Sequence, residues 1–173
     1  MRLTALAATL AIAAGLPAAA QPKIETPQMV VYEGQWVQTK VAGQKGALMF
    51  LTVPRGQKGE YFSISCERAG GGLVRTIKLG YPKPIQGDNV PITLNVDGQV
   101  TQATASFTGK ARDDAYTKAD IHTYALKFPS AADEQAVFRA MQRGNTLKVP
   151  GQTLPVDLRG FTAAFQGQTA YCD

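Results

Sequence analysis

The middle of this chain is a series of short segments of β-type composition, separated by glycine, proline, asparagine and aspartate. Short strands at near-regular spacing, with turn signals between them, are typical of antiparallel β-domains. We therefore expect a mainly β fold: a single antiparallel β-sandwich-like domain. The predicted strands are 29–32, 35–41, 47–54, 61–67, 73–79, 90–96, 99–108 and 121–128.

One pair of segments carries the pattern of a hairpin. Ile92 and Leu94 alternate with more polar residues, so they should share a buried face, because successive strand residues point to opposite sides. Asp97 and Gly98 follow, and this dipeptide suits a type I′ turn, which needs positive φ at both central positions. Residues 90–108 are therefore predicted to form a β-hairpin.

The apolar periodicity changes in the C-terminal third. Ser130 and Asp133 form a start resembling a capping box, and helical spacing follows until Gly144. We expect an amphipathic helix there. The later predicted elements are strands at 146–149 and 154–158 and a short C-terminal helix carrying Phe161, Ala164 and Phe165.

The first twenty residues read as a secretory signal peptide. An arginine precedes an apolar run shorter than a membrane span, and small residues lead up to Gln21. We expect cleavage before Gln21, a flexible or extended arm at 21–28 and one domain at 29–173. The protein would then be periplasmic or secreted, without a transmembrane anchor.

The charge pattern argues against a nucleic-acid partner. The net charge is +5, but no three basic residues are consecutive. A nucleic-acid footprint concentrates lysine and arginine on one face or segment. The sequence also carries no cofactor motif, because the glycine run at 70–72 continues as a strand instead of ending in a phosphate loop.

The chain has two cysteines, Cys66 and Cys172. In an oxidising compartment, a pair of otherwise lone cysteines favours a disulfide. The bridge would close a loop of about 100 residues and contribute about 4–5 kcal/mol in the chain-entropy model. The Cys-x-x-Cys spacing of redox centres is absent from the sequence.

His122 is the single histidine, so any imidazole-dependent chemistry must use it. Strand parity places Asp120 beside it, and Asp113 and Asp114 come a few residues earlier. These four residues form a weak polar cluster that could serve a small hydrolase. A partly buried structural histidine is the alternative, and without a second histidine we predict no metal site.

A second candidate is the proline-stiffened segment Tyr81, Pro82, Lys83 and Pro84. It joins an aromatic ring and a cation in a predicted loop, which is where partner sites concentrate. An inhibitor of a secreted hydrolase could present such a loop.

The C-terminal third resembles the invasion-associated locus B family of small exported proteins from Gram-negative, chiefly alphaproteobacterial, cells. The residues that carry the likeness are the helix at 136–144, Leu147-Lys148-Val149, the segment 156–165 and Cys172. The resemblance implies a periplasmic or surface-associated β-sandwich with a structural disulfide and no established enzymatic chemistry.

The combined expectation is an exported binding or envelope-accessory protein without catalytic residues or a cofactor. Its partner would be an envelope or secreted protein. The sequence leaves the oligomeric state open. A small envelope hydrolase using His122 and an inhibitor of a secreted hydrolase remain the alternatives.

Overall fold

The computed structural model describes residues 24–32, 36–41, 44–51, 58–69, 72–114 and 118–172. The predicted signal peptide at 1–20 and the start of the predicted arm lie outside the described residues.

The described residues form a mainly β domain, as predicted. The strands are β1 (Ile24–Glu25), β2 (Met29–Val31), β3 (Trp36–Val41), β4 (Gln44–Leu51), β5 (Tyr61–Ala69), β6 (Gly72–Tyr81), β7 (Asn89–Val96), β8 (Gln99–Asp113), β9 (Ala119–Lys127), β10 (Thr146–Lys148) and β11 (Val156–Asp157). The helices are α1 (Ala131–Arg143) and α2 (Phe161–Cys172).

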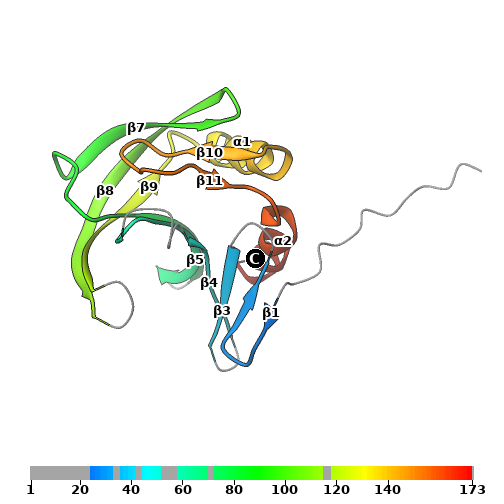
Figure 1. The fold of residues 1–173 in the computed structure, drawn as a ribbon. Helices are drawn as coiled ribbons and strands as arrows, with labels where there is room; N and C mark the ends of the chain where they lie inside the picture. Colours follow the sequence, from blue (N-terminus) through cyan, green and yellow to red (C-terminus); the bar gives the residue numbers. More distant parts are fainter. Residues whose placement is uncertain are drawn as a thin grey trace, which may run out of the picture.

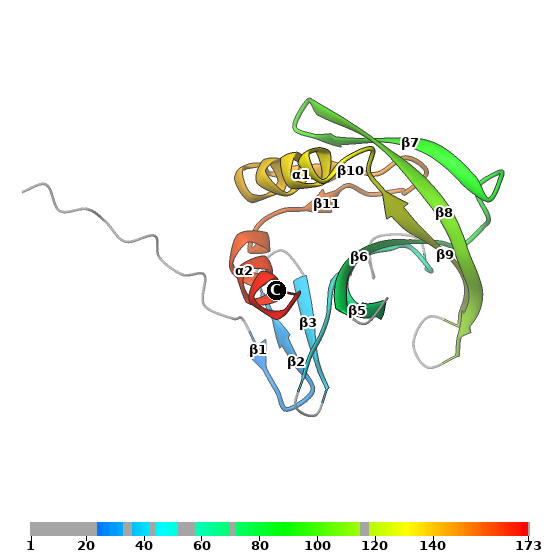
Figure 2. The same ribbon diagram turned by 180° about the vertical axis from the view of Figure 1, so that it is seen from behind.

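The strands make one antiparallel sheet in the order β1-β2-β3-β4-β5-β6-β9-β8-β7-β10-β11. The sheet curls strongly, so that its early strands and its last strands both come to lie beside α2 (Figure 1). The view from behind shows the same curl, with α1 close to the β7–β8 hairpin (Figure 2). The inner face of this curled sheet holds the core.

Trp36 is the centre of that core. Its side chain is fully buried, and its ring lies 4.8 Å from Phe161, 5.5 Å from Phe50 and 6.1 Å from Phe62. Its indole N–H donates to the backbone oxygen of Asp157 over 2.8 Å. Because Trp36 belongs to β3 and Asp157 to β11, this bond joins two strands that are far apart in the sheet order.

Both helices pack on the inner face. α1 contacts β7 and β8, and α2 contacts β3 to β6. Ser130 caps α1 by accepting a hydrogen bond from the Asp133 N–H, as the sequence predicted, and Gly144 ends the helix. The two helices meet through Phe138 and Phe165, whose rings stack 4.7 Å apart.

The predicted hairpin is confirmed, with β7 and β8 joined by Asp97 and Gly98 at positive φ. The carboxylate of Asp97 also accepts hydrogen bonds from the backbone N–H groups of Asn145 and Thr146. The tip of the hairpin is thereby tied to the connection between α1 and β10.

Several strand boundaries differ from the predicted ones, and two of the differences change the shape of the sheet. Ile24 and Glu25 pair with Val31 and Val30, so this part of the predicted arm is an edge strand of the sheet. β8 continues to Asp113 instead of ending at 108, because β9 pairs with it as far as Ala119. The side chains in this extension are mostly polar, so the alternation of apolar and polar residues did not predict a strand there.

We expect Trp36→Phe to lower the free energy of unfolding by about 1–3 kcal/mol, because it removes the bond to Asp157 and leaves a small void. Urea denaturation followed by circular dichroism would measure the change. Val100→Ala, at a residue that is 54% exposed, is the control and should shift stability by less than about 0.5 kcal/mol. An unchanged midpoint for Trp36→Phe would show that the closing bond contributes nothing.

Candidate functional site

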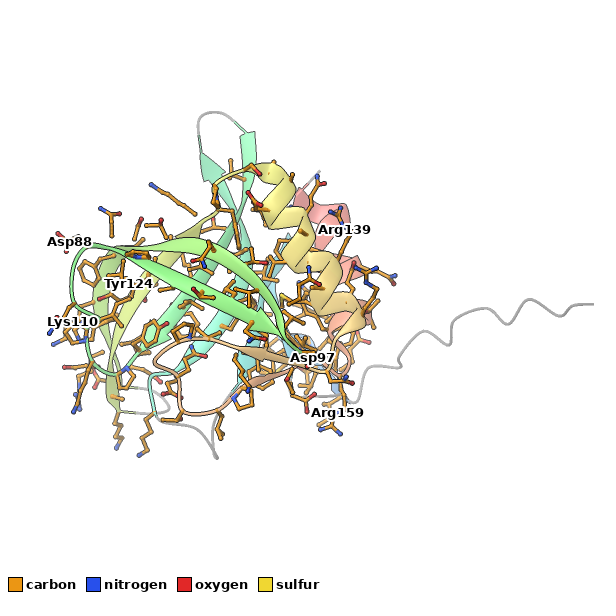
Figure 3. The ribbon with its side chains drawn as sticks, turned by 90° about the horizontal axis from the view of Figure 1, so that it is seen from above. Asp88, Asp97, Lys110, Tyr124, Arg139 and Arg159 are labelled. Carbon is orange, nitrogen blue, oxygen red and sulfur yellow. The ribbon has the colours of Figure 1, made fainter. Side chains whose placement is uncertain are left out.

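The two candidate sites lie at the same end of the sheet. Tyr81, at the end of β6, is the direct cross-strand neighbour of His122 on β9. Figure 3 shows Lys110, Tyr124 and Asp88 gathered at this end, with Asp97 and Arg159 at the other. Sequence reasoning treated the loop and the polar cluster separately, because only the β6–β9 register brings them together.

A bulge in β8 determines which side chains face inward at this end. Phe107 pairs with Tyr124, and Gly109 is the next residue in register, opposite Thr123. The extra residue reverses the alternation, so Lys110 and Arg112 lie on the same face as Phe107. Bulges of this kind commonly re-aim side chains next to functional sites.

β6 ends at Tyr81, opposite His122, so β8 and β9 continue past Lys110 and His122 as a two-stranded ribbon. An ion-pair network lies at this ribbon. Asp120 accepts from Lys110 Nζ at 2.8 Å and from Arg112 at 3.4 Å. Arg112 also pairs with Asp114 at 2.9 Å. All four groups are well exposed, so the network is worth little in stability but fixes the positions of the charges.

These ion pairs change the interpretation of the predicted polar cluster. Asp120 and His122 lie on one face of β9, as strand parity predicted. The oxygens of Asp120, however, face Lys110 and Arg112. Asp113 lies on β8 in register with Ala119, on the opposite face from Arg112. Two carboxylates of the cluster, those of Asp114 and Asp120, are therefore ion-paired with Lys110 and Arg112.

Phe107 gives this surface an exposed aromatic ring. Its side chain is 40% exposed, although it faces inward and packs 5.3 Å from the ring of Tyr124. The ring of His122 lies 6.4 Å from it on the other side. Together with three charged side chains, these two rings form one surface, the ribbon face: Phe107, Lys110, Arg112, Asp120 and His122.

Sequence reasoning missed three members of the ribbon face: Phe107, Lys110 and Arg112. Phe107 lay inside a predicted strand, and the two cations lay past its predicted end. The available signal was Gly109, since an isolated glycine within a strand pattern indicates a bulge.

The predicted partner loop needs a correction at Tyr81. The strand continues through Tyr81, which alternates with Ile77 and Leu79, and its side chain is only 2% exposed. Its hydroxyl donates to the backbone oxygen of Pro150, and burial raises the pKa of this phenol. The aromatic ring is therefore core, and only Lys83 and Pro84 of the predicted loop are fully exposed.

The residues after Tyr81 form a loop that is anchored to the same end of the sheet. The hydroxyl of Tyr124 accepts from the N–H of Ile85 and lies 3.2 Å from its carbonyl oxygen. The backbone oxygen of Asp88 accepts from the N–H of Phe107. The loop is thus held against the inner side of the ribbon.

Glu60 is a buried carboxylate on the neighbouring strand edge, with 5% exposure. It accepts hydrogen bonds from both the backbone N–H and the hydroxyl of Thr153. This arrangement fastens the β10–β11 connection to the start of β5, which is a structural role.

No group of three potential metal ligands occurs among the residues that the structure describes. Neither described helix is long and apolar enough to cross a bilayer.

The two cysteines lie on elements that contact each other. Cys66 is in β5 and Cys172 is the last residue of α2, and α2 packs against β5. Their side chains lie outside the described part of the structure, so the bridge remains a prediction.

Thiol counting on the denatured, unreduced protein should therefore find no free thiol. Removing the bridge with Cys66→Ser and Cys172→Ser should lower the free energy of unfolding by about 2–5 kcal/mol. Two free thiols in the purified exported protein would contradict the bridge.

Hydrogen bonds from Lys110, and the charge of Arg112, lower the pKa of Asp120 from its ordinary value of 3.8. The stabilisation that Asp120 provides is thus present above pH 3.8 and is lost as the pH falls through the lower pKa of the folded state. A carbon-13 NMR titration should find this pKa below 3.8 in the native protein and closer to 3.8 in Lys110→Met. Identical titration curves would mean that the ion pair does not form in solution.

No protein-family model, curated protein or solved structure matches this chain. The comparisons therefore show no family, and the resemblance to invasion-associated locus B proteins stays a prediction.

Proposed function

We propose that this protein is an exported, non-enzymatic binding module of the bacterial envelope that engages a protein partner through its ribbon face. One observation carries the proposal. The bulge in β8 turns Lys110 and Arg112 to the same side as the exposed ring of Phe107, on a ribbon that extends past β7.

The composition of the ribbon face fits a protein partner. Aromatic residues and arginine are enriched in protein–protein interfaces, and partly exposed rings supply much of the binding energy. Lys110 and Arg112 are balanced by Asp114 and Asp120, so the surface offers alternating charges instead of one strong positive field. Nucleic acids favour a surface with one strong positive field.

Export supports an envelope role. The signal-peptide pattern at 1–20 directs the chain out of the cytoplasm, and the resemblance in the C-terminal third points to the same compartment. Cell fractionation with an antibody against the mature domain tests this part directly. Retention of the full precursor in the cytoplasm would contradict it.

The hydrolase alternative depends on His122 acting with a carboxylate. A general base is normally oriented by a neighbouring acceptor, as in hydrolytic triads. The nearest predicted acceptor, Asp120, instead bonds to Lys110 and Arg112. This arrangement favours binding over catalysis. His122→Ala should accordingly leave the protein folded and should abolish no hydrolytic turnover of an envelope substrate.

The function is tested by crosslinking the mature protein in cells and identifying partners in the envelope fraction by mass spectrometry. Phe107→Ser should reduce recovery of the specific partner by about fivefold or more, because it removes the exposed ring. Val100→Ser is the matched control, since Val100 is 54% exposed and lies on the outer face of the same strand.

Equal loss of the partner from both variants, or from neither, would exclude the ribbon face as the binding surface. Turnover of an envelope substrate that disappears in His122→Ala would replace the binding role with the hydrolase.

A further inference from the structure

In the described part of the chain, β8 has no strand neighbour on its β7 side beside Lys110 and Arg112. β7 pairs with β8 only from Gln99 to Ser106, where Asn89 begins β7. From there to Asp113, β9 is the one neighbouring strand of β8 among the described residues. Figure 1 shows this end of β8 projecting at the lower left, away from β7. Unpaired strand edges are templates for adding another strand.

The direction of the backbone groups at this edge follows from one hydrogen bond. The N–H of Phe107 donates to Asp88 on the β7 side. Backbone N–H groups alternate between the two sides of a strand in step with the side chains. Lys110 and Arg112, which share the inner face with Phe107 after the bulge, therefore present their N–H groups at the free edge.

The same two residues set the charge that an added strand would meet. Lys110 and Arg112 are 52% and 55% exposed, and each keeps N–H donors beyond those used by Asp114 and Asp120. Opposite charges on directly facing residues stabilise antiparallel pairs, whereas like charges oppose them. At the positions that directly face Lys110 and Arg112, an added strand with acidic residues two positions apart is therefore favoured over one with basic residues there.

The bulge and the two cations also oppose unselective pairing of other strands with this edge. Lysine and β-bulges are common devices that keep edge strands from aggregating. Such features make strand addition selective when the intended partner carries the matching charges.

From these observations we infer that the partner binds by adding an extended strand to β8 along residues 108–112, and that this strand carries acidic residues at alternate positions, opposite Lys110 and Arg112. This inference rests on the proposed function, since it specifies how the ribbon face recognises a protein. It adds backbone hydrogen bonds to Lys110 and Arg112 as the main attachment.

The test uses a short synthetic peptide of alternating glutamate and valine, with a lysine–valine peptide of the same length as control. The acidic peptide should bind the native protein at least about tenfold more tightly than the basic one. Hydrogen exchange followed by NMR should show new protection at the amides of Lys110 and Arg112. The amide of Ala111, which faces β9, should keep its protection unchanged.

The variant Lys110→Glu with Arg112→Glu should reverse the preference and favour the lysine peptide, with circular dichroism confirming that it is folded. Binding without protection at the two amides would overturn strand addition, as would failure of the charge reversal in a folded variant. Both results leave the cellular partner test with Phe107→Ser intact, so the failure of strand addition is distinguishable from the failure of the proposed function.

Discussion

The hydrogen bond from Trp36 to Asp157 is the contact on which the curled sheet depends. It joins β3 to β11, and the aromatic rings around the indole fill the space that the curl encloses. An open sheet of this size would leave that apolar face exposed to water, which is costly in proportion to its area. The part of β8 that continues past β7, together with the part of β9 paired with it, projects from this curled sheet.

The projecting ribbon combines two properties that rarely occur together on a solvated strand. Its ring at Phe107 is apolar and exposed, and the adjacent positions carry paired charges. The bulge alone accounts for this combination, because without the extra residue Lys110 and Arg112 would face outward. A one-residue irregularity in the backbone thus decides whether the end of the sheet is an ordinary solvent face or a candidate interface.

Local patterns predicted much of the fold. Some features depend on only a few adjacent residues, and the structure confirms them: the β class, the turn at Asp97-Gly98 and the cap at Ser130. The ribbon face could not be derived in this way, because it depends on the register between β8 and β9. Tyr81 was misplaced for a related reason: the prolines after it indicated a loop, whereas its alternation with Leu79 indicated burial.

The closure of the sheet also dictates when this fold can form. Trp36 and Asp157 are 121 positions apart, so the indole N–H lacks its hydrogen-bond acceptor until nearly the whole chain is available. Contacts between distant residues slow folding, because the intervening chain must be ordered first. The sheet of this protein therefore cannot close around Trp36 until the chain through β11 is available.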